Sequence, residues 1–184
     1  MSKLVLMMGV SLDGLVARPG KFGAGDWGLP PEDPALKARK LDWLGEAGMH
    51  LMGRVTYEEM AGFWPTSDDE YAAPMNSLPK VVFSKTLTKA DWAQSTVASG
   101  DLEDEITALK RKPGRDMIAW GGAAFAQSLS GLGMVDEYRL VLQPVALGDG
   151  LSLFAGLTAP LVLNLMEARS YADGAVLHVY RPAS

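Results

Sequence analysis

Short apolar runs recur along this chain, and four of them end in a polar or glycine-rich segment. The four segments are Ser11-Leu-Asp-Gly14, Gly53-Arg-Val-Thr-Tyr-Glu58, Val81-Val-Phe-Ser-Lys85 and Trp120-Gly-Gly-Ala123. Apolar runs of about four to eight residues that alternate with helix-forming sequence are typical of buried strands in an α/β sheet. Such a sheet binds its ligand beyond the carboxyl ends of its strands. The pattern therefore predicts an α/β fold with its functional site at that edge.

Local patterns place the individual elements. Strands are predicted at residues 3–10, 49–52, 80–84, 96–98, 117–120 and 138–145, with a final hairpin of 161–168 and 175–180. Helices are predicted at 34–47, 57–61, 101–111 and from 123 to about 130, with Thr56 and Glu59 as a capping box for the second. The acidic, proline-broken stretch 66–79 is predicted to be a surface connection. We expect a single domain over residues 1–184, with a mixed, mostly parallel sheet covered by helices.

Composition narrows the class of function. The net charge of -5 gives no general attraction to nucleic acid or to an anionic membrane, so any anion recognition must be local. Cysteine is absent, which excludes disulfides, a thiol nucleophile and Cys-ligated zinc, and no metal site is predicted. The apolar run 4–8 is too short for a signal peptide, and no run reaches the roughly 18 residues of a membrane helix. We expect a cytoplasmic protein.

The strand ends carry groups suited to a phosphate. Arg54, Thr56, Ser84 and Lys85 are cationic or hydroxyl donors, and Gly121-Gly122 allows backbone to approach a diphosphate closely. These residues predict a phosphorylated nucleotide lying across the strand ends. The alternative is that Arg54 makes a surface ion pair and the two glycines form a simple turn.

Five motifs in order give the chain a family likeness. They are 11–14, Met52-Gly-Arg-Val-Thr-Tyr-Glu58, Leu78-Pro-Lys-Val-Val-Phe-Ser-Lys85, Trp120-Gly-Gly122 and the segment 135–148, VDEYRLVLQPVALG. The set resembles the dihydrofolate-reductase-like superfamily, and most of all the branch that contains the reductase domain of bacterial riboflavin biosynthesis. The resemblance runs from about Lys3 to Phe154. It implies a three-layer α/β/α domain that binds NADPH and transfers hydride from the nicotinamide ring.

The resemblance also implies a cofactor site. Arg54 and Thr56, which follow Gly53, match positions that contact the cofactor phosphates, and Ser84 and Lys85 match a pair near the adenosine 2′-phosphate. The glycines that pass the diphosphate and the nicotinamide correspond to Gly121 and Gly122, with Ala123 as a third small residue in this family pattern.

Two acids are candidate proton donors. Glu32 has the spacing from Trp27 by which dihydrofolate reductases, in this resemblance, place a carboxyl near the pterin ring. Asp13 is the second candidate, because the first loop of such a fold lies beside the nicotinamide, and Asp26 stays open. The alternatives are that Glu32 is a solvated acid before a helix and that Asp13-Gly14 is an ordinary turn. Trp27 is a candidate wall for a planar substrate.

One departure from the family's sequence pattern narrows the range of candidate substrates. Dihydrofolate reductases carry an arginine that clamps the folate tail before the lysine of the third strand, whereas this chain has Pro79 before Lys80. Folate is therefore a poor candidate. The leading hypothesis is an NADPH-dependent reductase of a small heterocyclic or imine-containing compound, and the rival is a nucleotide-binding protein of the same fold without turnover. The riboflavin-pathway substrate remains possible.

Three further features are interpreted from the sequence. The segment 23–28 matches the pattern Gly-x-Gly-x-x-Gly, but it follows no strand and precedes no helix, so a loop is predicted. His50 and His178 lie in apolar runs and are predicted to be core or edge residues. The segment 135–148 is apolar on both faces toward its end, which predicts an exposed patch covered in a homodimer with one cofactor groove per subunit.

Overall fold

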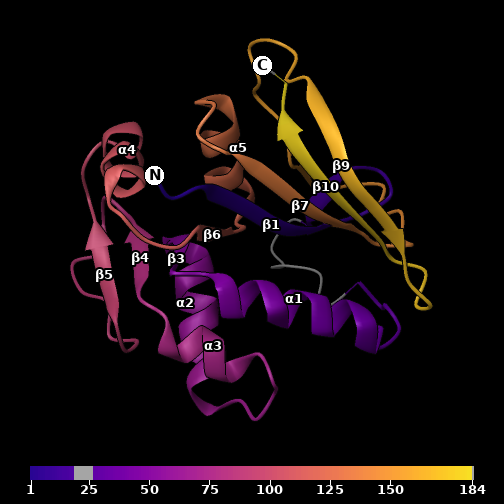
Figure 1. The fold of residues 1–184 in the computed structure, drawn as a ribbon, viewed down its shortest axis with the longest axis horizontal. Helices are drawn as coiled ribbons and strands as arrows, with labels where there is room; N and C mark the ends of the chain where they lie inside the picture. The colour runs from indigo at the N-terminus through magenta and orange to yellow at the C-terminus, as the bar shows by residue number, and fades with distance from the viewer. Residues whose placement is uncertain (19–26, 184) are drawn as a thin grey trace.

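The structure is a computed structural model that describes residues 1–18 and 27–183. Within them, eight strands form one sheet in the order β5-β4-β3-β6-β1-β7-β10-β9, shown in Figure 1. The strands are β1 (Leu4–Val10), β3 (Met49–Gly53), β4 (Lys80–Phe83), β5 (Ser95–Ala98), β6 (Met117–Trp120), β7 (Glu137–Leu142), β9 (Leu163–Ser170) and β10 (Val176–Pro182). The six strands from β5 to β7 are parallel, so their carboxyl ends share one edge of the sheet. The hairpin β9–β10 joins β7 in antiparallel register.

Helices cover both faces of the sheet (Figure 1). They are α1 (Pro34–Glu46), α2 (Arg54–Phe63), α3 (Ala72–Ser77), α4 (Leu102–Arg111) and α5 (Ala123–Gly131), and a 3-10 turn, η2 (Trp64–Thr66), follows α2. The core has two clusters that correspond to the two faces. Leu36 and Trp43 of α1 pack in one cluster, and Ile106 of α4 and Phe125 of α5 pack in the other. The three-layer α/β/α arrangement with a mostly parallel sheet and a C-terminal hairpin is therefore confirmed.

Most predicted elements are present within a few residues of their expected bounds. Two short strands, β2 (Leu15–Ala17) and β8 (Leu151–Ser152), pair with each other and were not predicted. The stretch 66–79 is not only a surface connection, because it contains α3, in which Ala72 and Met75 are buried. The predicted cap is also wrong. Helix α2 begins at Arg54 with Gly53 as its N-cap, and Thr56 is buried inside the first turn.

The predicted position of the exposed apolar patch is corrected by the sheet order. Strand β7 lies between β1 and β10, and Leu140 is only 6% exposed. Of the leucines that follow this segment and were expected in the patch, Leu153 is buried and Leu151 is exposed. Further exposed apolar side chains lie on and beside the edge strand β9, at Val162, Leu165 and Met166. No helix among the described residues is long and apolar enough to cross a membrane.

Candidate functional site

Two neighbouring strands each lead directly into a helix at the carboxyl edge of the sheet. Strand β3 ends at Gly53 and is followed by α2, and strand β6 is followed by Gly121, Gly122 and then α5. Neither helix has a side chain that caps its first N–H groups. Uncapped N–H groups at a helix start carry partial positive charge and bind anions. This edge therefore presents two such starts on adjacent strands.

Close packing favours glycine at this edge, and at Gly122 the backbone conformation favours it as well. A Cβ at Gly122 would stand 3.0 Å from Thr56 Oγ1, and Gly122 has a φ of +84°, a backbone conformation that favours glycine. A Cβ at Gly121 would overlap the Met8 side chain of β1, and one at Gly53 would lie 3.3 Å from Phe125 Cβ. The structure thus brings together the predicted residues Gly53, Gly121 and Gly122, with Ala123 as the first residue of α5.

Thr56 connects the start of α2 to the turn that leads into α5. It is 8% exposed, and its hydroxyl donates a hydrogen bond to the carbonyl of Gly121. A buried hydroxyl that is satisfied by backbone keeps that backbone in one position. Thr56 therefore holds the turn after β6 against α2, a role different from the helix capping that its sequence position suggested.

Arg54 lies at the same edge and makes the ion pair that was considered as its alternative role. Its Nη1 donates to both carboxylate oxygens of Glu58, one turn along α2, at 3.0 and 2.9 Å. Both side chains are about half exposed. Exposed pairs of this spacing contribute only about 0.3–0.5 kcal/mol, so the pair offers little resistance to an incoming phosphate.

Ser84 and Lys85 follow β4, whose register sets Phe83 beside Gly53. Ser84 Oγ accepts hydrogen bonds from the backbone N–H groups of Thr86 and Leu87, which shapes the turn after the strand. Lys85 Nζ donates to the carbonyls of residues 99 and 100 at 2.8 and 2.6 Å, and its side chain is exposed. The sheet thus places these two residues on the strand next to Arg54.

Glu32 lies just before α1 and is already engaged. One carboxylate oxygen accepts from the hydroxyl of Tyr71 at 2.7 Å, and the other pairs with Lys40. Burial and the neighbouring Glu32 carboxylate raise the pKa of Tyr71, so its hydroxyl remains a protonated donor. Tyr71 was missed by the sequence analysis because it lies in the stretch interpreted as a surface connection.

Asp13 fastens two loops at the carboxyl ends of β1 and β7. Its carboxylate accepts from Ser11 Oγ at 2.6 Å and from the backbone N–H groups of Leu147 and Gly148. These hydrogen bonds, that of Ser11 foremost, lower the pKa of Asp13 to about 2. Asp13 is therefore a carboxylate near neutral pH, and its geometry favours a structural role over that of a proton donor.

Trp27 is buried, at 6% exposed, and its Nε1 has no hydrogen-bond partner among the described residues. Its role as a wall for a planar substrate stays a prediction. Asp26 and most of the 23–28 segment lie outside the described residues.

A buried histidine lies behind the glycine turn. His50 is fully buried on β3, where its Nδ1 accepts from the indole N–H of Trp120 at 2.9 Å, and its Nε2 lies 3.2 Å from the carbonyl of Pro74. Burial, chiefly, lowers the pKa of His50 to about 4, so the ring is neutral. His50 is a core residue, as predicted, and it positions the residue that precedes Gly121.

Comparison with known proteins identifies the family of this fold. Residues 2–179 match the family described as the RibD C-terminal domain. The chain belongs to this family. It is 31% identical over 183 residues to the uncharacterized protein YyaP of Bacillus subtilis (strain 168), an alignment that covers 97% of this chain and 94% of YyaP. The likeness to the riboflavin-biosynthesis reductase branch, predicted from motifs, is confirmed.

Solved structures agree with the fold. A Shewanella sp. PV-4 protein, provisionally named a riboflavin biosynthesis protein, superposes with a TM-score of 0.78 at 24% identity, over 99% of both chains. A diaminohydroxyphosphoribosylaminopyrimidine deaminase/5-amino-6-(5-phosphoribosylamino)uracil reductase of Thermotoga maritima gives a TM-score of 0.71 at 15% identity, over 99% of this chain and 57% of that one. At these identities the superpositions establish a shared fold.

Proposed function

We propose that this member of the RibD C-terminal domain family is an NADPH-dependent reductase of a small heterocyclic or imine-containing compound. The observation that carries the proposal is the pair of uncapped helix starts, α2 and α5, on the adjacent strands β3 and β6. Gly121 and Gly122, in the turn that leads into α5, carry no side chain that would obstruct a diphosphate, which is the central group of a dinucleotide.

The flanking residues fit the remaining parts of NADPH. Arg54 and Lys85 are exposed cations on neighbouring strand ends, and Ser84 adds a hydroxyl, so the three suit the adenosine 2′-phosphate. The bound cofactor supplies hydride to an electrophilic carbon. This chain's own residues hold the phosphates, and Tyr71 with Glu32 forms a hydrogen-bonded pair that could hold a proton for the product.

A second candidate is a nucleotide-binding protein without turnover. The observation that favours it is the engagement of both predicted acids. The Glu32 carboxylate already contacts Lys40 and Tyr71. The Asp13 carboxylate is ionised and holds two loops together by hydrogen bonds. If neither group transfers a proton, binding persists without chemistry.

The binding experiment compares NADPH with NADH by calorimetric titration. NADPH is expected to bind more tightly, because each charge-assisted hydrogen bond to the 2′-phosphate contributes about 1.5–3 kcal/mol. Arg54→Gln and Lys85→Gln should weaken NADPH binding and leave NADH nearly unchanged. Arg111→Gln, a change to an exposed residue at the far end of α4, is the matched control. Equal affinities for the two nucleotides, or no binding of either, would remove the cofactor assignment.

The turnover experiment follows NADPH absorbance with two test substrates. The first is 5-amino-6-(5-phosphoribosylamino)uracil, the substrate in the name of the Thermotoga relative. The second is dihydrofolate, for which we expect at best very slow turnover, since Pro79 supplies no cation for the glutamate tail. Binding of NADPH with no oxidation by a panel of cyclic imines and pyrimidines would favour the second candidate. Rapid dihydrofolate reduction would show that another cation clamps the tail.

We also propose that the protein forms a two-fold homodimer through the β9 edge. An edge strand presents unpaired backbone groups, and here it also carries the exposed side chains of Val162, Leu165 and Met166. Leu165→Glu should give a monomer in sedimentation velocity, whereas Leu132→Glu, at an exposed leucine after α5, should not. A monomeric mass for the unchanged protein would contradict the proposal.

A further inference from the structure

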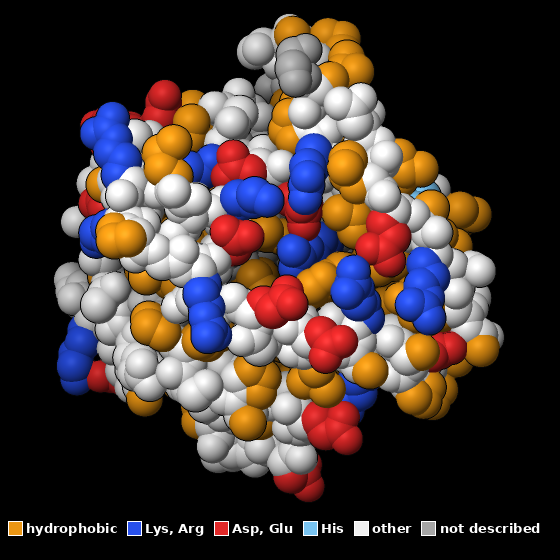
Figure 2. Space-filling view, in the orientation of Figure 1, with side chains coloured by type: hydrophobic (Ala, Val, Ile, Leu, Met, Phe, Trp, Pro, Cys, Tyr) orange, Lys and Arg blue, Asp and Glu red, His pale blue; other side chains and the backbone are white. Residues whose placement is uncertain are grey.

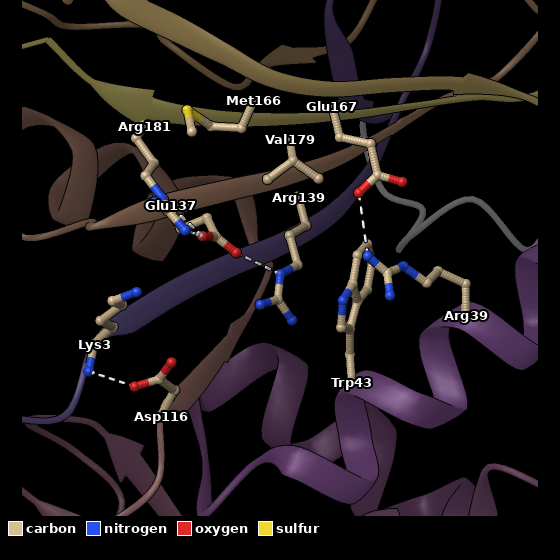
Figure 3. A pocket seen from close by; sticks show the side chains of 10 residues that line it. All are labelled: Lys3, Arg39, Trp43, Asp116, Glu137, Arg139, Met166, Glu167, Val179 and Arg181. Atoms are coloured by element: carbon tan, nitrogen blue, oxygen red, sulfur yellow. Dashed lines mark hydrogen bonds and ion pairs between the residues drawn. The ribbon is translucent and has the colours of Figure 1, made fainter.

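A charged cavity lies away from the carboxyl edge, between α1 and the strands β7, β10 and β9. Its volume is about 270 Å³. Figure 3 shows the side chains that line it, which are Lys3, Arg39, Trp43, Asp116, Glu137, Arg139, Met166, Glu167, Val179 and Arg181. Lys3 precedes β1, Asp116 precedes β6 and Glu137 begins β7, so the cavity opens near the amino ends of the parallel strands. In Figure 2 basic and acidic side chains gather around a hollow on this face.

The centre of the cavity is a carboxylate shared by two arginines. Glu137 is 5% exposed and accepts from Arg139 Nε at 2.8 Å and from Arg181 Nε and Nη2 at 3.0 and 2.9 Å. Burial would raise the pKa of Glu137, but the two guanidinium groups outweigh it and lower the pKa. The group formed by Glu137, Arg139 and Arg181 therefore contains two cations and one carboxylate, so one positive charge in it is not neutralised.

Two arginines of the cavity, Arg39 and Arg139, contact the ring of Trp43. Trp43 lies between two guanidinium groups, with Arg139 Cζ 4.3 Å and Arg39 Cζ 4.8 Å from its ring centroid (Figure 3). Arg39 Nη2 pairs with Glu167 of β9 at 3.1 Å, while its Nε is buried and has no partner among the described residues. Stacking on an aromatic face fixes the plane of a guanidinium and leaves its edge free to bind.

The side chains that line the cavity include more cations than carboxylates. Four lining residues are cations and three are carboxylates, in a protein whose net charge is -5. Arg139 uses only Nε on Glu137, and in Figure 3 its two terminal nitrogens point into the cavity. Its side chain is 14% exposed, so this positive charge is poorly hydrated. A bidentate oxyanion would satisfy such a fork.

We propose that this cavity is a binding site for a small phosphate-bearing metabolite, separate from the nucleotide edge. Arg139 and Arg39 are the residues that would hold the phosphate, with the excess charge of the Glu137 group favouring an anion. The volume of about 270 Å³ is close to the lower end of the roughly 300–1,000 Å³ of small-molecule sites, which leaves room beside a phosphate for a short carbon skeleton.

The test uses inorganic phosphate and glycerol 3-phosphate as probes, in calorimetric titrations of the full chain at constant ionic strength against chloride. Arg139→Gln and Arg39→Gln should each weaken binding about tenfold to hundredfold, since each removes charge-assisted hydrogen bonds. Arg139→Gln leaves Glu137 paired with Arg181, so the fold is expected to persist, which circular dichroism checks. Arg111→Gln, at an exposed residue outside both sites, is the control and should bind both probes as the unchanged protein does, and Arg54→Gln detects any phosphate that binds at the nucleotide edge.

Three outcomes would overturn the proposal. The first is no binding of either probe at millimolar concentration. The second is loss of binding in Arg54→Gln with retention in Arg139→Gln, which would place the phosphate at the nucleotide edge. The third is that the unchanged protein is a dimer that binds no phosphate and that Arg139→Gln is a monomer. This result would show that a carboxylate of a second copy fills the cavity. Because the Arg54→Gln arm reports on the other edge, failure of this site and failure of the proposed cofactor site are distinguishable.

Discussion

His50 makes the stability of this protein depend on pH. The ring is fully buried between Trp120 and the carbonyl of Pro74, and its hydrogen bonds suit the neutral tautomer with the proton on Nε2. Burial is the main reason that the pKa falls from 6.5 to about 4, and the nearby Lys80 lowers it further against the opposing effect of the Pro74 carbonyl. The unfolded chain therefore binds a proton in a range where the folded protein does not.

The sign and size of the effect follow from linkage. Between pH 6.5 and pH 4 the unfolded state carries more protons, so the free energy of unfolding decreases as the pH falls through this range. A pKa difference of about 2.5 corresponds to about 3 kcal/mol in total, of which about 2 kcal/mol falls between pH 7 and pH 5. Well below pH 4 both states are protonated at His50, and this contribution is constant.

The assay is urea denaturation followed by tryptophan fluorescence at several pH values from 7 to 5, for the unchanged protein and for His50→Gln. Glutamine keeps a donor for Pro74 and an acceptor for Trp120 but does not titrate in this range. The difference between the two proteins removes the contributions of all other groups. The free energy of unfolding should fall about 2 kcal/mol more in the unchanged protein than in the variant. Equal pH dependence in both proteins would refute the assignment of a buried neutral His50.

Other changes test the remaining contacts. Gly122→Ala should lower the free energy of unfolding by about 1–3 kcal/mol in denaturant titrations, because alanine is strained at a φ of +84° and its Cβ meets Thr56 Oγ1; unchanged stability would show that the turn relaxes. Glu137→Gln should lower it by about 1–3 kcal/mol, since two arginines lose a charged acceptor, and should also tighten phosphate binding in calorimetry. Asp33→Ala should lower the melting temperature, as it removes the cap of α1 and a hydrogen bond from the Ala172 N–H.

The order of the elements, and the edge of the sheet at which the predicted site residues gather, could be predicted from the sequence because both depend on local patterns. Strand β6 was expected at 117–120 and is found at Met117–Trp120, and the helix expected at 101–111 is found as α4, Leu102–Arg111, with Asp101 as its cap. Parallel strands place their carboxyl ends together whatever their order in the sheet. The likeness of Gly53, Gly121 and Gly122 to one family pattern could therefore be recognised before their neighbours were known.

Side-chain partners could not be predicted, because they come from segments far apart in the chain. Thr56 has the spacing of a helix cap, yet its partner is the carbonyl of Gly121, 65 residues away. Tyr71 reaches Glu32 from a stretch whose prolines and acids resemble a loop. The charged cavity combines residues of α1, β7 and the terminal hairpin, and no local sequence pattern relates Arg39 to Glu167.

Helix α1 lies between the charged cavity and the segment that carries Glu32, and it is held by the terminal hairpin. Its first turn is tied to the hairpin by Asp33, whose carboxylate accepts from the Ala172 N–H at 2.7 Å and whose own N–H donates to Asp173 at 3.0 Å. Its middle is tied to β9 by Arg39 and Glu167. Glu32 lies next to Asp33, the residue that caps α1 and contacts the hairpin, so the position of the Glu32 carboxylate depends on how this end of α1 lies against the hairpin. An anion bound between Arg39 and Arg139 would join α1 to β7 as well, and would restrain the helix that follows Glu32.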